Sequence, residues 1–101
     1  MAQRNFKFHD GERGSALAVR VRQIRGDSCF AKVHKDGTVV VHLKQGASDS
    51  NSRLIEFISE RLGISQERIQ VVAGEGGNNK LISIIDMTPK EIQKMILELI
   101  P

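Results

Sequence analysis

The sequence predicts an α/β (α+β) domain, a two-layer sandwich in which two helices pack on one face of a mixed sheet of about five strands. The chain has 101 residues, enough for one hydrophobic core and too few for two. Its early segments alternate apolar and polar residues, a pattern typical of half-buried strands. Two later segments each carry one apolar stripe with helical spacing. These apolar surfaces are all buried when both helices cover the same side of the sheet.

The first fourteen residues differ in character from the rest of the chain. Residues 1–14 are polar and end in turn-forming residues, so we expect a flexible N-terminal segment, followed by one domain over residues 15–101. An extra edge strand through Phe6 and Phe8 is the alternative interpretation. The domain begins with a long strand whose buried face consists of Leu17, Val19 and Val21.

The next two strands are expected to form a hairpin across Asp36-Gly37, a dipeptide typical of turns. A three-residue loop, 35–37, places Val33 opposite Val39, so that the apolar residues of both strands share one face. A two-residue loop would put them on opposite faces. In the longer loop Gly37 takes a left-handed backbone conformation. The predicted core-facing positions are Cys29, Ala31, Val33, Val39, Val41 and Leu43, with Ala31 opposite Val41.

The second half of the chain alternates helical and strand patterns. A helix with one apolar stripe begins at Asp49 or Ser50, whose side chains accept free backbone N–H groups, and ends at Gly63. Two apolar strands, over residues 69–73 and 81–85, flank a glycine-rich loop. A capping box with proline at the first helical position starts a second amphipathic helix.

Charge is unevenly distributed, although the net charge is only +3. Residues 1–44 hold nine lysines and arginines against four acidic residues, whereas residues 45–101 hold six against eight. Such asymmetry is typical of an anion-binding surface, and it also occurs where charge only keeps a protein in solution. The single Cys29 permits no internal disulfide, the histidines lack metal-ligand spacing, and no apolar run approaches the ~20 residues of a membrane helix. We therefore expect a cytoplasmic monomer without cofactor, metal or membrane contact.

Basic residues and histidines alternate with the apolar residues of the first three strands, so we expect them on the opposite face of the sheet. Phosphates of RNA or DNA bind such a face with release of counterions. Phe30 is in phase with these residues and would stack on a base. The alternative is a solvated face whose charges discourage edge pairing. The candidate nucleic-acid-binding residues are Arg20, Arg22, Phe30, Lys32, His34, His42 and Lys44.

A second candidate site combines the glycine-rich loop with the start of the first helix. Successive N–H groups of a glycine-rich turn can form a nest for an anion, and a flexible connection is the alternative. Asn51 lies in the first helical turn, where free N–H groups favour anions, and Lys80 starts a strand. If the fold brings the two together, they would grip a phosphate or carboxylate; alternatively, Asn51 is a helix cap. The candidate anion-binding residues are Asn51, Gly74, Gly76, Gly77 and Lys80.

Several local patterns occur together in the middle of the chain. Asn51 opens the first helix, and the runs Leu62-Gly63-Ile64-Ser65 and Val71-Val72-Ala73-Gly74 follow, the second with Lys80 after it. In this order and spacing, over about residues 15–87, the chain resembles the YggU-like family, a widespread small domain of unknown function. The resemblance implies a mixed sheet with two helices on one face, and no established activity. Two basic positions of the family pattern are absent, and the departures fall at Ser48, Asp49, Gly77 and Asn78.

These features favour a non-enzymatic binding module whose basic sheet face binds nucleic acid. One alternative is a small enzyme that acts on a phosphorylated or carboxylated metabolite near the glycine-rich loop. Another is a protein-interaction module that pairs through an exposed strand edge.

Overall fold

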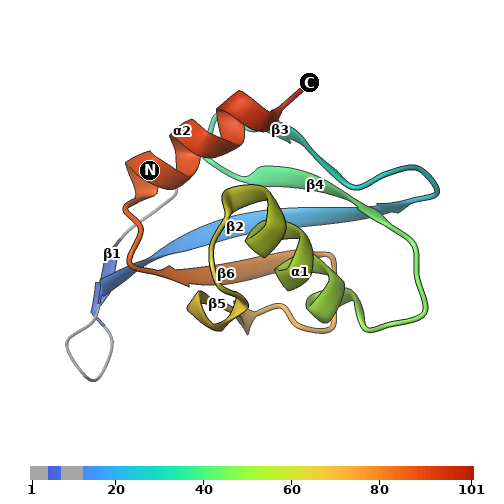
Figure 1. The fold of residues 1–101 in the computed structure, drawn as a ribbon, viewed down its shortest axis with the longest axis horizontal. Coiled ribbons are helices and arrows are strands. Elements are labelled where there is room, and N and C mark those ends of the chain that lie inside the picture. Colours follow the sequence, from blue (N-terminus) through green and yellow to red (C-terminus); the bar gives the residue numbers. More distant parts are fainter. Residues whose placement is uncertain (1–4, 8–12) are drawn as a thin grey trace.

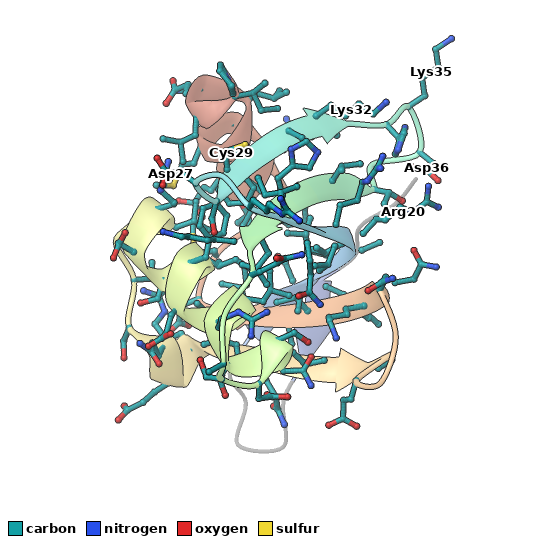
Figure 2. The ribbon with its side chains drawn as sticks, turned by 90° about the vertical axis from the view of Figure 1, so that its right-hand side faces the viewer. Arg20, Asp27, Cys29, Lys32, Lys35 and Asp36 are labelled. Atoms are coloured by element: carbon teal, nitrogen blue, oxygen red, sulfur yellow. The ribbon has the colours of Figure 1, made fainter. Side chains whose placement is uncertain are left out.

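The computed structural model describes residues 5–7 and 13–101, and in it two helices lie on the same side of a mixed sheet (Figures 1 and 2). The predicted two-layer α+β sandwich is therefore confirmed. The elements, in chain order, are β1 (Asn5–Lys7), β2 (Arg13–Ile24), β3 (Cys29–Val33), β4 (Val39–Lys44), α1 (Ser50–Leu62), the short 3-10 helix η1 (Gln66–Arg68), β5 (Ile69–Ala73), β6 (Asn79–Ile85) and α2 (Pro89–Leu99).

Strand β2 is the centre of the sheet, whose strand order is β3-β4-β2-β6-β5. It runs parallel to β4 and antiparallel to β6. The two neighbours pair with different parts of β2: β6 covers residues 14–20, and β4 covers residues 19–24. The loops that precede β4 and β6 therefore both reach β2 near its midpoint, around Arg20.

The N-terminal part of the domain differs from the sequence-based expectation. Strand β2 begins at Arg13, two residues before the expected start, and β1 pairs with it in antiparallel orientation, with Phe6 opposite Gly14. Because β4 begins only opposite Val19, the first residues of β2 have an open edge, which β1 occupies. The rest of the predicted flexible segment, including Phe8, lies outside the described residues.

The hydrophobic core lies between the sheet and the two helices. The alternate residues of β2 and β4 that the sequence assigns to the core are buried as predicted. They pack against the apolar stripes of both helices. The central residues of this core are Leu17, Val19, Val21, Val39, Val41, Leu43, Leu54, Ile58, Ile92 and Ile96. The polarity of these strands is therefore confirmed, and none of the described helices lies on the other face of the sheet.

The hairpin between β3 and β4 confirms the loop length and corrects the face of one residue. His34 N–H donates to the Thr38 carbonyl, and Gly37 has φ 93°, so the loop is the predicted three-residue turn. Val33 lies opposite Val39 as expected. Further along, a β-bulge shifts the register, and Phe30 instead of Ala31 lies opposite Val41.

The bulge turns Phe30 into the core, where it is 1% exposed and its ring centroid lies 4.8 Å from that of Phe57. A phenylalanine buries far more apolar surface at this position than an alanine would. This burial stabilises the fold and offsets the disrupted backbone pairing at the bulge. Cys29, predicted to face the core, lies opposite His42 on the other face and is half-buried.

Both helices begin as the sequence predicts. The Asp49 side chain accepts the Ser52 N–H at the start of α1, and Thr88 forms a capping box with Glu91 at the start of α2. Gly63 ends α1 with φ 68°. Neither helix is both long enough and apolar enough to cross a membrane.

Candidate functional site

The face of the sheet opposite the helices, here called the outer face, carries the basic residues that the sequence assigned to it. Figure 2 shows Arg20 and Lys32 pointing away from the helical layer. Four of the side chains are exposed to solvent: Arg20, Arg22, Lys32 and Lys44. His34 and His42 lie among them and are half-buried. The structure thus brings six of the seven candidate residues onto one surface.

Strand register groups these side chains into rows across the sheet. Arg22 lies opposite His42, which lies opposite Cys29. Arg20 and Lys32 flank the same residue of β4 in the next row. Neighbouring strands are ~4.8 Å apart, so the cationic groups of three strands form one continuous surface.

Acidic residues are absent from the strands that make this surface. None of the described strands contains an aspartate or glutamate, although the whole chain has 12 acidic residues. The acidic residues of the described part lie in helices, turns and loops, and both α1 and α2 carry charges of both signs. The net charge of +3 therefore understates the positive potential of the outer face.

Phe30 does not belong to the outer face, and its assignment as a stacking residue is wrong. The bulge at Ala31 places it in the core against Phe57, which is also buried. The sequence has no Trp or Tyr, and the rings of Phe30 and Phe57 are both buried in the core, so neither is available for a base to stack on. What this surface offers is charge and hydrogen-bond donors, which suit phosphates better than bases.

The structure brings Asn51 and Lys80 together, the condition on which the second candidate site depended, on the side of the sheet opposite the outer face. Lys80 is 4% exposed, and its Nζ lies 2.6 Å from Asn51 Oδ1 and 3.1 Å from the Glu75 carbonyl oxygen. The Gly74 carbonyl oxygen lies 3.5 Å from the same nitrogen. Asn51 Nδ2 in turn donates to the Glu75 carbonyl. Lys80 thus ties the glycine-rich loop to the first turn of α1.

This arrangement satisfies Lys80 internally. An ammonium group has three donors, and three oxygens of the chain surround this one. The loop turns carbonyl oxygens towards the cation, whereas an anion nest would present N–H groups. Among the described residues, the partners of the Lys80 ammonium group are these three neutral oxygens, and no carboxylate forms an ion pair with it. Binding of an anion by Asn51, Lys80 and the loop glycines stays a prediction, and the observed hydrogen bonds do not favour it.

The loop glycines have different structural roles. Gly74 has φ 76°, and a Cβ at this position would collide with the Asn79 carbonyl oxygen, so the tight closure of the loop requires glycine there. Gly77 donates its N–H to the Gly74 carbonyl, while Gly76 and Gly77 have open space around the position of a Cβ. Only Gly74 is required by the geometry.

A hollow that the sequence did not predict lies in the helical layer, between α1 and the loop before β3. Its volume is about 610 Å³, and its lining includes Asp27, Glu56, Glu60 and Arg61. The Arg61 side chain crosses it, donating to the Ser28 carbonyl and lying 5.2 Å from the centre of the Phe57 ring. Its carboxylates make this hollow unsuitable for an anion. Within the described residues, no three His, Cys, Asp or Glu side chains are placed to hold a metal ion.

No family model matches the chain. The resemblance to the YggU-like family therefore stays a prediction.

Proposed function

We propose that this protein is a nucleic-acid-binding module that holds RNA or DNA by its phosphate backbone against the outer face. The observation that supports the proposal is the segregation of charge: four exposed cations lie on a face that no described helix covers, and the described strands contain no Asp or Glu. The proposal includes a monomeric chain in the cytoplasm, where such ligands are abundant.

The chemistry of the face predicts how binding depends on salt and sequence. Each phosphate neutralised on duplex DNA contributes about −0.9 to the slope of log affinity against log salt. Four such contacts give a slope of about −3 to −4. Because Phe30 and Phe57 are buried in the core and the exposed cations of the face contact phosphates, base composition should have little effect on affinity.

The test compares two double variants with the same change in charge. Arg22→Glu with Lys44→Glu reverses two charges of the outer face, and Lys90→Glu with Lys94→Glu reverses two exposed charges of α2. Fluorescence anisotropy with labelled 20-mers of single-stranded RNA, duplex RNA and duplex DNA gives the affinity over a salt series.

We expect the outer-face variant to lose about 100-fold in affinity, because it loses two charge-assisted contacts and gains two repulsive ones. The α2 variant should lose less than about tenfold, since its charges act only over distance. Absence of binding by the unchanged protein at low salt, or equal losses in the two variants, would refute the proposal.

A further inference from the structure

We propose that Arg20 is the anchor of the outer face, and that a backbone phosphate of the nucleic acid docks beside it between two loops. This inference rests on the proposed function and identifies the position on the face that contributes most. At the middle of β2, the pairing with β6 ends and the pairing with β4 begins. Arg20 lies opposite Asn79, the first residue of β6, and next to Val19, which lies opposite the first residue of β4.

Two hollows meet at this position. One, of about 480 Å³, is lined by Arg20, Thr38 and the hairpin loop that carries Lys35. The other, of about 330 Å³, is lined by Arg20, Thr38 and the start of β6 with the adjoining Gly74. Both share Arg20 and Thr38, so the arginine stands between two recesses of the surface. Figure 2 shows its side chain on the same side as Lys32 and the hairpin tip.

Arg20 is oriented by the chain and still open to a ligand. Its Nε donates to Asn79 Oδ1 at 3.1 Å, which fixes one edge of the guanidinium group. The two terminal nitrogens make no hydrogen bond to any described residue, and the side chain is exposed. A planar guanidinium fork held in one orientation matches the oxygens of a phosphate, and less side-chain entropy remains to be lost on binding.

The charges around Arg20 favour an anion. His34 and Lys35 line the hairpin side of the site, and Asp36 is the one carboxylate among the described residues that line it. Asp36 Oδ1 accepts the Thr38 N–H at 2.9 Å, so this carboxylate serves the hairpin turn. Two cationic side chains and an imidazole therefore face one carboxylate that is already hydrogen-bonded within the loop.

The test compares Arg20→Ala with Arg25→Ala, which removes the same charge from the exposed loop that follows β2. With a labelled 20-base-pair duplex RNA, we expect Arg20→Ala to weaken binding about tenfold or more and to reduce the salt slope by about one. Arg25→Ala should weaken binding by about threefold or less. Arg20→Lys keeps the charge but loses the fork, and should fall between wild type and Arg20→Ala.

Asn79→Ala tests the positioning role without changing charge. We expect an affinity loss of about threefold with an unchanged salt slope and an unchanged unfolding midpoint, because the phosphate contact persists with a less ordered arginine. Unchanged affinity would contradict that role.

Equal losses in Arg20→Ala and Arg25→Ala would overturn the anchor while leaving the proposed function intact. Failure of the unchanged protein to bind any duplex would overturn the proposed function itself.

Discussion

Two neighbouring cations of the sheet, Lys80 and Arg20, differ in what they do for the molecule. Lys80 lies opposite Val19, the residue before Arg20, so the two charged side chains leave adjacent positions towards opposite faces. Lys80 is buried and surrounded by three oxygens of the chain, whereas Arg20 is exposed and fixed only along its Nε edge. The comparison teaches that strand alternation decides which cation stabilises the fold and which is available to a ligand.

The largest expected effect is a loss of stability at Phe30, and it tests whether the core face and the outer face of β3 have different roles. Phe30→Ala should lower the free energy of unfolding by about 3–5 kcal/mol, because it opens a cavity against Phe57. Lys32→Ala, on the same strand and the outer face, should change it by less than about 0.5 kcal/mol. Urea denaturation measures both. A stable Phe30→Ala protein with weakened nucleic-acid binding would restore Phe30 as a stacking residue.

The next effect concerns Lys80 itself. Lys80→Met keeps the apolar stem and removes the ammonium group, so Asn51 Oδ1 and two loop carbonyls lose their donor. We expect the free energy of unfolding to fall by about 2–3 kcal/mol, the cost of leaving buried polar groups unsatisfied. Lys94→Met on the exposed side of α2 is the matched control and should be nearly neutral. Little loss of stability combined with a large loss of RNA affinity would show that Lys80 serves the ligand instead.

The smallest expected effect is a change in stability at low pH, and it comes from Asp36 at the tip of the hairpin between β3 and β4. The hydrogen bond from the Thr38 backbone N–H lowers the pKa of the Asp36 carboxyl below its ordinary value of 3.8. A depressed pKa in the folded state stabilises the protein fully above pH 3.8 and loses this contribution as the pH falls through the folded value. Asp36→Asn keeps an acceptor oxygen and should flatten the fall in thermal midpoint below pH 4. Identical pH profiles of the two proteins would contradict this origin of the shift.

Much of the architecture was predictable because alternation and turn chemistry are local properties. The polarity of β2 and β4, the three-residue turn with Gly37 and the caps at Asp49 and Thr88 all follow from residues close together in the chain. The face of Phe30 was not predictable in this way. A bulge at Ala31 reverses the alternation of faces along β3. The bulge places Phe30 against Phe57 of α1, a contact between residues far apart in the chain that the local pattern does not show.

The candidate sites, too, were predictable only where they depend on local sequence patterns. The sequence singled out Asn51 and Lys80 but left open whether the fold brings them together. The loop carbonyls that surround the Lys80 ammonium group depend on backbone directions that the sequence does not display. The contribution of Asn79 to orienting Arg20 was missed. The alternation of faces along a strand could have shown it. Asn79 directly precedes Lys80, whose side chain faces the core, so the Asn79 side chain lies on the outer face with Arg20.

The bulges in β3 and β5 have a consequence for how copies of the protein behave when they are crowded together. These are the two strands at the ends of the sheet order, and each pairs irregularly with its neighbour, between Phe30 and Lys32 in one and between Val71 and Ala73 in the other. A kinked border offers no even ladder of amide and carbonyl groups for a second sheet to extend. Copies of the protein at high local concentration should therefore remain separate particles and resist fusion into fibrils.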